Sequence, residues 1–361
     1  MSAAPVSSFL AEASPSAEVR RLMETASGYD PDVWQQMAHR GLLGLHLPTR
    51  YGGQGLGWAE LSSTLEETGA VLLCAPFLST AMAVTAVVHG GDEAVRREVL
   101  PAITGGNSIA TVAIAEDDGV WGDEAVRTTA TPDGETWRLD GHKSYVVDGQ
   151  VADLLVVAAR RSDTGSVGLF LVAGTAPGLT RAPLETVDLT RKQMRLELAA
   201  VPARPLEGMP VDRLIDLAAL AVAAESVGGA QRCLDMSVAH ASRRVQFGQP
   251  IGTFQAVAHP CAEMLVDIEC ARSAVHHAAR LADQRDRSGV DGGLAVAASL
   301  AKAASSEAYA RAAARSIQIH GGLGFTWDCD AQLYYKRARS SALLLGDARF
   351  HRERLAGRLG W

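Results

Sequence analysis

The chain has 361 residues, roughly two to three times the usual length of one domain, so a single compact core is not expected. Hydrophobic residues make up 47% and charged residues 21%, which excludes bulk disorder and the fibrous classes. The formal net charge of −7 argues against a nucleic-acid partner, because a nucleic-acid surface needs a basic stripe.

The five cysteines are widely spread and form no C-x-x-C pair, so neither a disulfide framework nor a zinc site is expected. The first 21 residues lack a basic segment followed by an apolar one, so we expect no signal peptide. The longest apolar stretch, residues 214–227, contains Asp216 and Glu225 and is too short to span a membrane. These features predict a cytoplasmic protein with no metal and no membrane partner.

Residues 18–106 show helical periodicity with breaks at Pro48 and at Gly52-Gly53. Two further helices are expected over 58–73 and 79–91, the second ended by a glycine pair. This part of the sequence predicts an N-terminal helical domain.

Between residues 109 and 206 the pattern changes to short β-like runs, separated by Gly, Asp, Thr and Pro at intervals of roughly ten residues. The turns at 131–136 and 161–166 have hairpin chemistry, with Asp or Thr before Gly. Strands at that spacing predict a small barrel or sandwich.

Long helices return after residue 207. The stretch 211–244 is apolar all round in its middle, which is typical of a helix buried inside a bundle. Ala-rich helices are expected over 254–284 and 294–322, with a terminal helix over 342–359, and small side chains suit a four-helix arrangement. The predicted fold is α+β and multidomain: an N-terminal helical domain (1–108), a middle β-barrel or sandwich domain (109–206) and a C-terminal four-helix-bundle domain (207–361).

Three segments carry motifs in a fixed order. Residues 48–55 read P-x-x-Y-G-G-x-G, residues 244–255 read R-x-x-F-G-x-x-I-x-x-F-Q, and residues 318–325 read Q-x-x-G-G-x-G-F. In type and order these motifs resemble those of the acyl-CoA dehydrogenase flavoprotein family, and the resemblance covers almost the whole chain. It implies the family's fold of helical, β and helical domains.

The chemistry of two of these segments suits a dinucleotide. Arg244 offers a planar five-donor cation for a diphosphate, and Gly321-Gly322 leaves bare backbone for a flat or anionic ligand. Without the resemblance, Arg244 is also consistent with a solvated surface charge, and Gly321-Gly322 with the end of a helix. The resemblance implies that this part of the chain contacts FAD seated mainly in a neighbouring subunit of a tetramer, through Arg244, Gln246, Phe247, Gln255, Gln318, His320, Gly321 and Gly322.

The family reaction removes hydrogens from Cα and Cβ of an acyl-CoA thioester, with a Glu as general base and the flavin as hydride acceptor. The resemblance aligns Leu345 and Ala218 with the two positions where the family places that Glu, and neither can accept a proton. Asp347 is the candidate substitute base, and its alternative role is a carboxylate at a helix N-terminus. Glu225 is more simply a partner charge inside the bundle.

The segments that resemble the flavin-ring pocket are also altered. Residues 115–124 keep Glu116 but lose the hydroxyls of the family's T-E-P-x-x-G-S-D loop. Residues 144–149 replace the family's W-[IV]-[ST]-N-G strand, although Tyr145 is still able to stack on a flavin. His240, between two alanines, is predicted to pack or to face solvent.

Two functions are consistent with this pattern. The first is an FAD-dependent acyl-CoA dehydrogenase that acts within an oligomer, homomeric or heteromeric. The alternative is a non-catalytic, FAD-clasping subunit paired with a paralogous subunit in a heterotetrameric acyl-CoA dehydrogenase for steroid or other bulky acyl-CoA. An oxygenase or nitroalkane-type oxidase on the same fold is a weaker hypothesis, because it too needs a pocket residue that the sequence does not supply. The resemblance implies an electron-transfer flavoprotein as electron acceptor.

Overall fold

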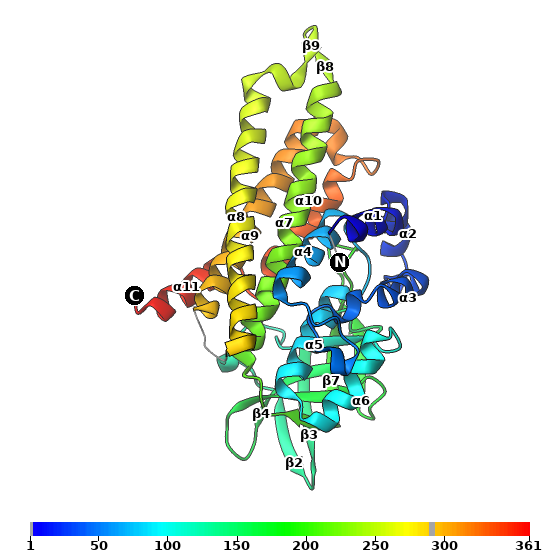
Figure 1. Cartoon of the computed structure of the whole chain (residues 1–361), viewed down its shortest axis with the longest axis vertical. Coiled ribbons are helices and arrows are strands. Elements are labelled where there is room, and N and C mark those ends of the chain that lie inside the picture. Colours follow the sequence, from blue (N-terminus) through cyan, green and yellow to red (C-terminus); the bar gives the residue numbers. More distant parts are fainter. Residues whose placement is uncertain (1–2, 289–292) are drawn as a thin grey trace. The chain divides into compact units, whose positions relative to one another are not determined.

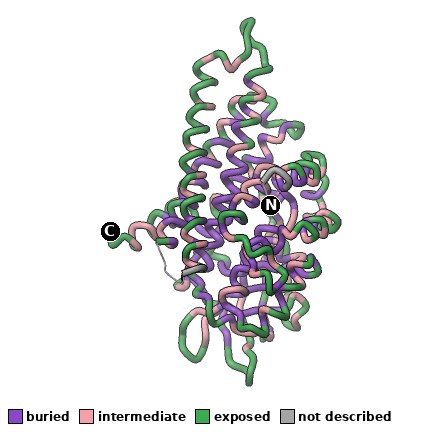
Figure 2. The backbone as a smooth tube through the Cα atoms, in the orientation of Figure 1, coloured by how far each residue is buried: buried purple, intermediate pink, exposed green. Residues whose placement is uncertain are grey.

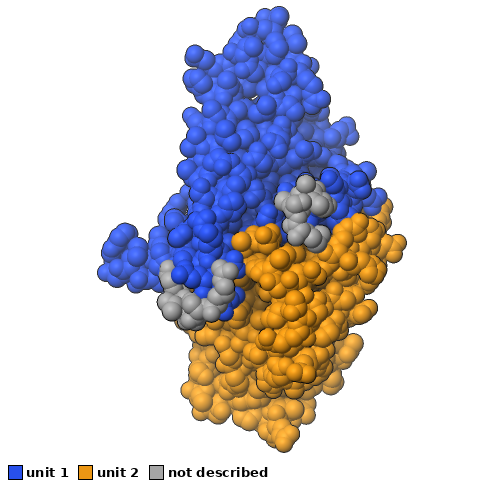
Figure 3. Space-filling model, viewed as in Figure 1, with its two compact units in different colours: residues 1–20, 61–73, 219–361 blue, residues 21–60, 74–218 orange. Residues whose placement is uncertain are grey.

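The structure, a computed structural model, describes residues 3–288 and 293–361. The chain divides into two compact units (Figure 3). Unit 1 comprises residues 1–20, 61–73 and 219–361, and unit 2 comprises residues 21–60 and 74–218.

The first third of the chain is helical, as expected, and two of its helices, α3 and α6, begin with side-chain caps. The side chain of Asp30 accepts hydrogen bonds from the first turn of α3, and Asp92 does the same for α6. Pro31 stands at the first helical position of α3, where its missing N–H costs nothing. The six helices are α1 (Ala3–Ala13), α2 (Ser16–Met23), α3 (Pro31–His39), α4 (Trp58–Ala70), α5 (Phe77–Gly90) and α6 (Glu93–Thr104).

The middle of the chain forms one seven-stranded sheet inside unit 2 (Figure 1). Its strands are β1 (Ala110–Ala113), β2 (Thr129–Asp133), β3 (Thr136–Val147), β4 (Leu154–Arg161), β5 (Val167–Ala173), β6 (Leu179–Pro183) and β7 (Gln193–Leu206). Hydrogen-bonded pairing runs from β4 through β2, β3, β7 and β5 and returns to β4, so the sheet closes on itself. Of the two architectures predicted, the barrel is therefore the one observed. Leu139, Leu155 and Phe170 are fully buried in its core.

Both predicted hairpins are confirmed. Asp133 pairs with Thr136 across the first turn, and Arg160 pairs with Val167 across the second. The sequence did not reveal β2 as a separate strand, because four of its five residues are exposed and its apolar signal is weak.

The described residues of the last third of the chain contain five α-helices: α7 (Val211–Arg243), α8 (Gln255–Ser288), α9 (Leu294–His320), α10 (Ala331–Leu343) and α11 (Ala348–Leu359). The expected long helices are confirmed. The prediction of one terminal helix over 342–359 is wrong, because the chain leaves the helix between α10 and α11. Leu345 has φ 62° and Gly346 has φ 95°, and neither value belongs to a right-handed helix.

Helix α7 is the core helix of its bundle. It is long and apolar enough to cross a membrane by composition, but 94% of its most apolar window is buried within the structure. Figure 2 shows this contrast along the chain: the middle of α7 is buried, whereas the hairpin that follows it is exposed. A buried core helix explains its composition without a membrane.

Glycines allow α4 and α7 to touch backbone to backbone within unit 1. A Cβ added to Gly228 would lie 1.7 Å from the carbonyl oxygen of Glu66, and one added to Gly69 would lie 1.9 Å from that of Glu225. No side chain fits at either position, so both glycines are required for this approach.

A buried ion pair lies beside this contact. Arg337 of α10 donates to Glu225 of α7 over 3.2 Å, and their side chains are only 3% and 7% exposed. The expectation that Glu225 is a partner charge inside the bundle is confirmed.

Replacing Arg337 with Met leaves the Glu225 carboxylate buried without this cation. Removing one partner of a buried pair is strongly destabilising, so we expect the free energy of unfolding to fall by about 3 kcal/mol. Urea denaturation followed by circular dichroism measures the change. The control is Arg97→Met, which breaks an exposed i,i+4 pair with Glu93 and should cost less than about 0.5 kcal/mol. Equal effects of the two variants would contradict this account of the pair.

Candidate functional site

The residues that resemble a dinucleotide clasp lie at one end of the bundle in unit 1. Arg244 follows the last residue of α7, and the strands β8 (Val245–Gln246) and β9 (Gln249–Pro250) form a hairpin beyond it. Phe247 and Gly248 make its turn with φ values of 52° and 78°, the geometry of a tight two-residue hairpin turn. The Phe247 ring is 92% exposed, which leaves a flat apolar face for a ligand or partner.

Gln255 begins α8 and is exposed, and its neighbour Phe254 contacts Phe247 edge to face with ring centroids 6.1 Å apart. The turn after the hairpin is thereby fixed by aromatic contact.

The second half of the predicted clasp is the end of α9. Gln318 is exposed, and His320 leads into the short 3₁₀ helix η5 (Gly321–Phe325). Gly321 has φ 62°, and a Cβ added to Gly321 or Gly322 would meet no atom within 4 Å. The backbone here is bare and open, as a closely approaching ligand requires.

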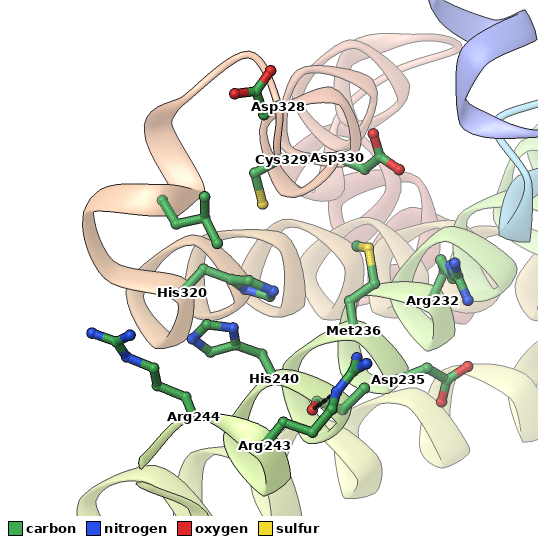
Figure 4. Close-up of a pocket in the computed structure, with 12 residues that line it drawn as sticks. Arg232, Asp235, Met236, His240, Arg243, Arg244, His320, Asp328, Cys329 and Asp330 are labelled. Carbon is green, nitrogen blue, oxygen red and sulfur yellow. Dashed lines mark hydrogen bonds between the residues drawn. The ribbon is translucent and has the colours of Figure 1, made fainter. Parts of the chain in front are cut away.

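The structure brings His240 and His320 together, which the sequence reasoning missed. Their ring centroids are 4.5 Å apart, and both rings line a cavity of about 580 Å³ that Arg244 also lines (Figure 4). Burial lowers the pKa of His240, and the charges of His320 and Arg244 lower it further. The prediction that His240 merely packs or faces solvent is therefore incomplete, because its ring belongs to a polar cavity. No sequence signal links residues 80 positions apart except their place at the ends of two neighbouring helices.

The two positions aligned with the family's catalytic Glu hold buried, uncharged side chains. Ala218 and Leu345 are each 1% exposed. Asp347 is exposed and is the N-cap of α11, where its side chain accepts a hydrogen bond from the N–H of Phe350 over 2.8 Å. This is the alternative role considered for Asp347, and its catalytic role stays a prediction.

A buried lysine holds the turn that carries Leu345. The Nζ of Lys302, fully buried in α9, donates to the carbonyl oxygens of Ser341 (3.1 Å) and Gly346 (3.0 Å). Burial lowers the pKa of His351 to about 3, so its ring is neutral, and its Nε2–H donates to the carbonyl of Leu345 over 2.9 Å. A lone lysine in an Ala-rich helix was the only sequence signal of this arrangement.

The region that resembles the flavin-ring pocket lies in unit 2, and its first polar group, Glu116, accepts hydrogen bonds from within the same unit through Oε1. Glu116 is buried and accepts hydrogen bonds from the N–H groups of Arg127 (2.9 Å) and Thr128 (2.8 Å). It also accepts one from Nζ of the fully buried Lys143, over 3.0 Å. Burial lowers the pKa of Lys143 to about 8, although Glu116 opposes the change. This pair ties the loop to the barrel.

Next to that pair, Asp117 gathers the hydroxyl groups of the altered strand. Ser144 donates to its carboxylate, and the hydroxyl of Tyr145 donates to its backbone carbonyl over 3.3 Å. Arg195 donates to the same carboxylate over 2.9 Å, and the hydrogen bonds from Arg195 and Ser144 lower the pKa of Asp117 to about 2. The polar groups in this region therefore hydrogen-bond to one another.

These observations test the fit of FAD to the chain. The residues at the end of the bundle suit the ADP half of FAD, because they combine the exposed guanidinium of Arg244, an exposed ring and open backbone. The ring-side residues fit poorly, since a charged Asp117–Arg195 pair stands among them. In the residues that the structure describes, no cluster suited to a metal ion is found.

Two family models match the sequence: the N-terminal domain of acyl-CoA dehydrogenase over residues 1–107 and the C-terminal domain over residues 211–360. The chain belongs to the acyl-CoA dehydrogenase family. Members of this family are oxidoreductases that act on CH–CH bonds, and the predictions of family, fold and reaction class are confirmed.

Individual relatives support this assignment along the whole chain. The chain is 34% identical to acyl-CoA dehydrogenase IpdE2 of Mycolicibacterium smegmatis over 345 residues, covering 95% of this chain and 92% of the relative. It matches the solved Tcur3481–Tcur3483 steroid ACAD with a TM-score of 0.91 and 32% identity, over 99% of this chain and 96% of the other. The ChsE4–ChsE5 complex of Mycobacterium tuberculosis matches with a TM-score of 0.90 and 27% identity over the same shares.

Variants of Asp347 separate a helix cap from a catalytic base. We expect Asp347→Ala to lower the free energy of unfolding by about 1 kcal/mol, because the cap of α11 is lost. Asp347→Asn should cost only a few tenths of that, since Asn is an equally good N-cap, and it should keep the turnover of the assembled enzyme. Urea denaturation and an acyl-CoA-dependent dye-reduction assay measure the two effects. Loss of turnover in Asp347→Asn with unchanged stability would make Asp347 the base.

Proposed function

We propose that this chain acts in the FAD-dependent α,β-dehydrogenation of an acyl-CoA thioester as the clasping subunit of a heterotetramer. A paralogous acyl-CoA dehydrogenase subunit supplies the general base and the flavin-ring pocket. The observation that carries the proposal is that both positions of the family's base, Leu345 and Ala218, are buried and unable to accept a proton. The residues of the ADP-side clasp are nevertheless all present and exposed or bordering a cavity.

When bound, FAD supplies the hydride acceptor of the reaction. The chain's own contribution is to bind and orient it. Arg244 presents donors suited to a diphosphate, the bare backbone at Gly321-Gly322 admits close approach, and Phe247 offers a flat apolar surface. Each contact would act on a cofactor whose ring is held elsewhere, which agrees with the poor fit of the ring-side residues in unit 2.

The relatives support a heteromeric assembly and a bulky substrate. Two solved structures with similar folds are a Tcur3481–Tcur3483 steroid ACAD and a ChsE4–ChsE5 complex. The description of each names two different proteins. By analogy we propose a steroid-derived or similarly bulky acyl-CoA as substrate. From the family we propose an electron-transfer flavoprotein as electron acceptor, and from the cysteine pattern of the sequence the cytoplasm as location.

The proposal is tested by making the chain alone and beside a paralogue that has the Glu. Alone, the chain should be colourless or poorly stable; the complex should be yellow and reduce an artificial acceptor with an acyl-CoA. Within that complex, Arg244→Ala should weaken FAD binding roughly 10- to 100-fold, since it removes a charge-assisted contact worth about 1.5–3 kcal/mol. Flavin fluorescence after dilution measures the loss.

The matched control is Arg97→Ala, which removes an exposed arginine of unit 2 and should leave flavin content unchanged. A yellow homomer of this chain that turns over acyl-CoA would overturn the proposal, and so would unchanged FAD retention in Arg244→Ala.

A further inference from the structure

The cavity at the end of the bundle contains a close pair of histidines, and the proposed function gives a role to His320 but none to His240. His240 comes from the last turn of α7 and His320 from the last residue of α9, and the rings face each other with an angle of 32° between their planes. Arg244 lines the same cavity on the side of His240 (Figure 4). A ligand bound by Arg244 therefore lies within reach of the electrostatic field of His240.

A backbone carbonyl fixes the tautomer of the His320 ring. Its Nδ1 lies 2.7 Å from the carbonyl oxygen of Ser316, which only accepts, so Nδ1 carries a proton. In the neutral ring Nε2 is then a bare acceptor. Two charged rings with centroids 4.5 Å apart would repel each other, so a second proton enters the pair only with an anion nearby.

The other charged side chains that line the cavity are arginines and aspartates. Three arginines and three aspartates line it: Arg232, Asp235 and Arg243 from α7, Arg244 after it, and Asp328 and Asp330 from the segment before α10. Asp330 also accepts hydrogen bonds from Arg20 (2.7 Å) and Ser16 (2.6 Å), so its charge is already compensated. The protonation of the histidines consequently decides how positive the cavity is.

We infer that His240 is a further dinucleotide-binding residue: it takes up a proton when a diphosphate binds beside Arg244, and its imidazolium then shares the neutralisation of that diphosphate. This inference rests on the proposed function, because it takes FAD as the ligand of Arg244. It names a role that Arg244 alone cannot fill, since a guanidinium stays charged at every accessible pH.

The direction of the pH dependence follows from linkage. Without ligand, burial and the neighbouring cations keep the pKa of His240 below its usual value, so the ring is neutral at pH 7. A diphosphate raises that pKa, and the bound state then holds more protons than the free state. Affinity therefore strengthens as pH falls through the pKa of the bound state and levels off below the pKa of the free state.

The test uses the assembly in which this chain retains FAD and measures FAD dissociation by flavin fluorescence from pH 5.5 to 8.5. The wild type should bind FAD roughly threefold to tenfold more tightly for each unit of falling pH in the linked window, the upper figure being the limit for one proton. Calorimetry in two buffers of different ionisation enthalpy should show the uptake of up to one proton. His240→Gln should abolish both the slope and the uptake.

Two further variants keep the test decisive. His320→Gln removes the repelling ring, so the slope should persist with its midpoint at higher pH. His39→Gln removes an exposed histidine of unit 2 and should behave as the wild type.

The failure of this inference differs from the failure of the proposed function. If Arg244→Ala weakens FAD binding but His240→Gln keeps the wild-type slope and proton uptake, His240 has no such role and the clasp stands. If Arg244→Ala keeps FAD as the wild type does, the clasp and the inference both fail. A wild type without pH slope or proton uptake overturns the inference alone.

Discussion

The backbone contact between α4 and α7 is the constraint on which the bundle of unit 1 depends. Gly69 and Gly228 admit the carbonyls of Glu225 and Glu66 so closely that no side chain fits at either site. Arg272 of α8 adds to this contact by donating to Glu66 over 2.9 Å. Helix α7 continues without a break from this contact to Arg243, so the contact positions the helix end from which the hairpin extends. A rigid helix is what allows exposed residues at its end to form a binding surface.

In this chain the exposed residues of the ADP-side clasp occur together with two aligned base positions, Ala218 and Leu345, that hold no proton acceptor. Hydrogen bonds from Lys302 and His351 hold the turn at Leu345 in its left-handed backbone conformation. The Leu345 side chain itself has no proton-accepting group. The altered loop of unit 2 is held in a similar way, because the carboxylate of Asp117 pairs with Arg195. Both regions are held by packing and hydrogen bonds among the chain's own residues, so their fold does not depend on a catalytic carboxylate or on flavin-facing hydroxyls.

Much of this was readable from the sequence. The long buried α7, the barrel hairpins and the exposed Gly321-Gly322 turn follow from local patterns of apolar residues, turn residues and glycines. Contacts between distant residues were not readable: Arg337 as the partner of Glu225, Lys143 as that of Glu116, and His320 as that of His240 depend on how elements pack. The break before α11 was missed although Gly346 and the N-cap Asp347 mark it in the sequence, and only the left-handed conformation of Leu345 has no sequence signature.

The central claim is that this chain binds the ADP half of an FAD that is seated in the paralogous subunit, and that it forms no flavin-ring site of its own. The most direct measurement is the ratio of FAD to each subunit in the purified, active complex, obtained from flavin absorbance after denaturation and from the protein mass. The account predicts one FAD for each paralogous subunit and none added by this chain, so half as many flavins as chains. One FAD for every chain would contradict it, because this chain would then seat a flavin itself.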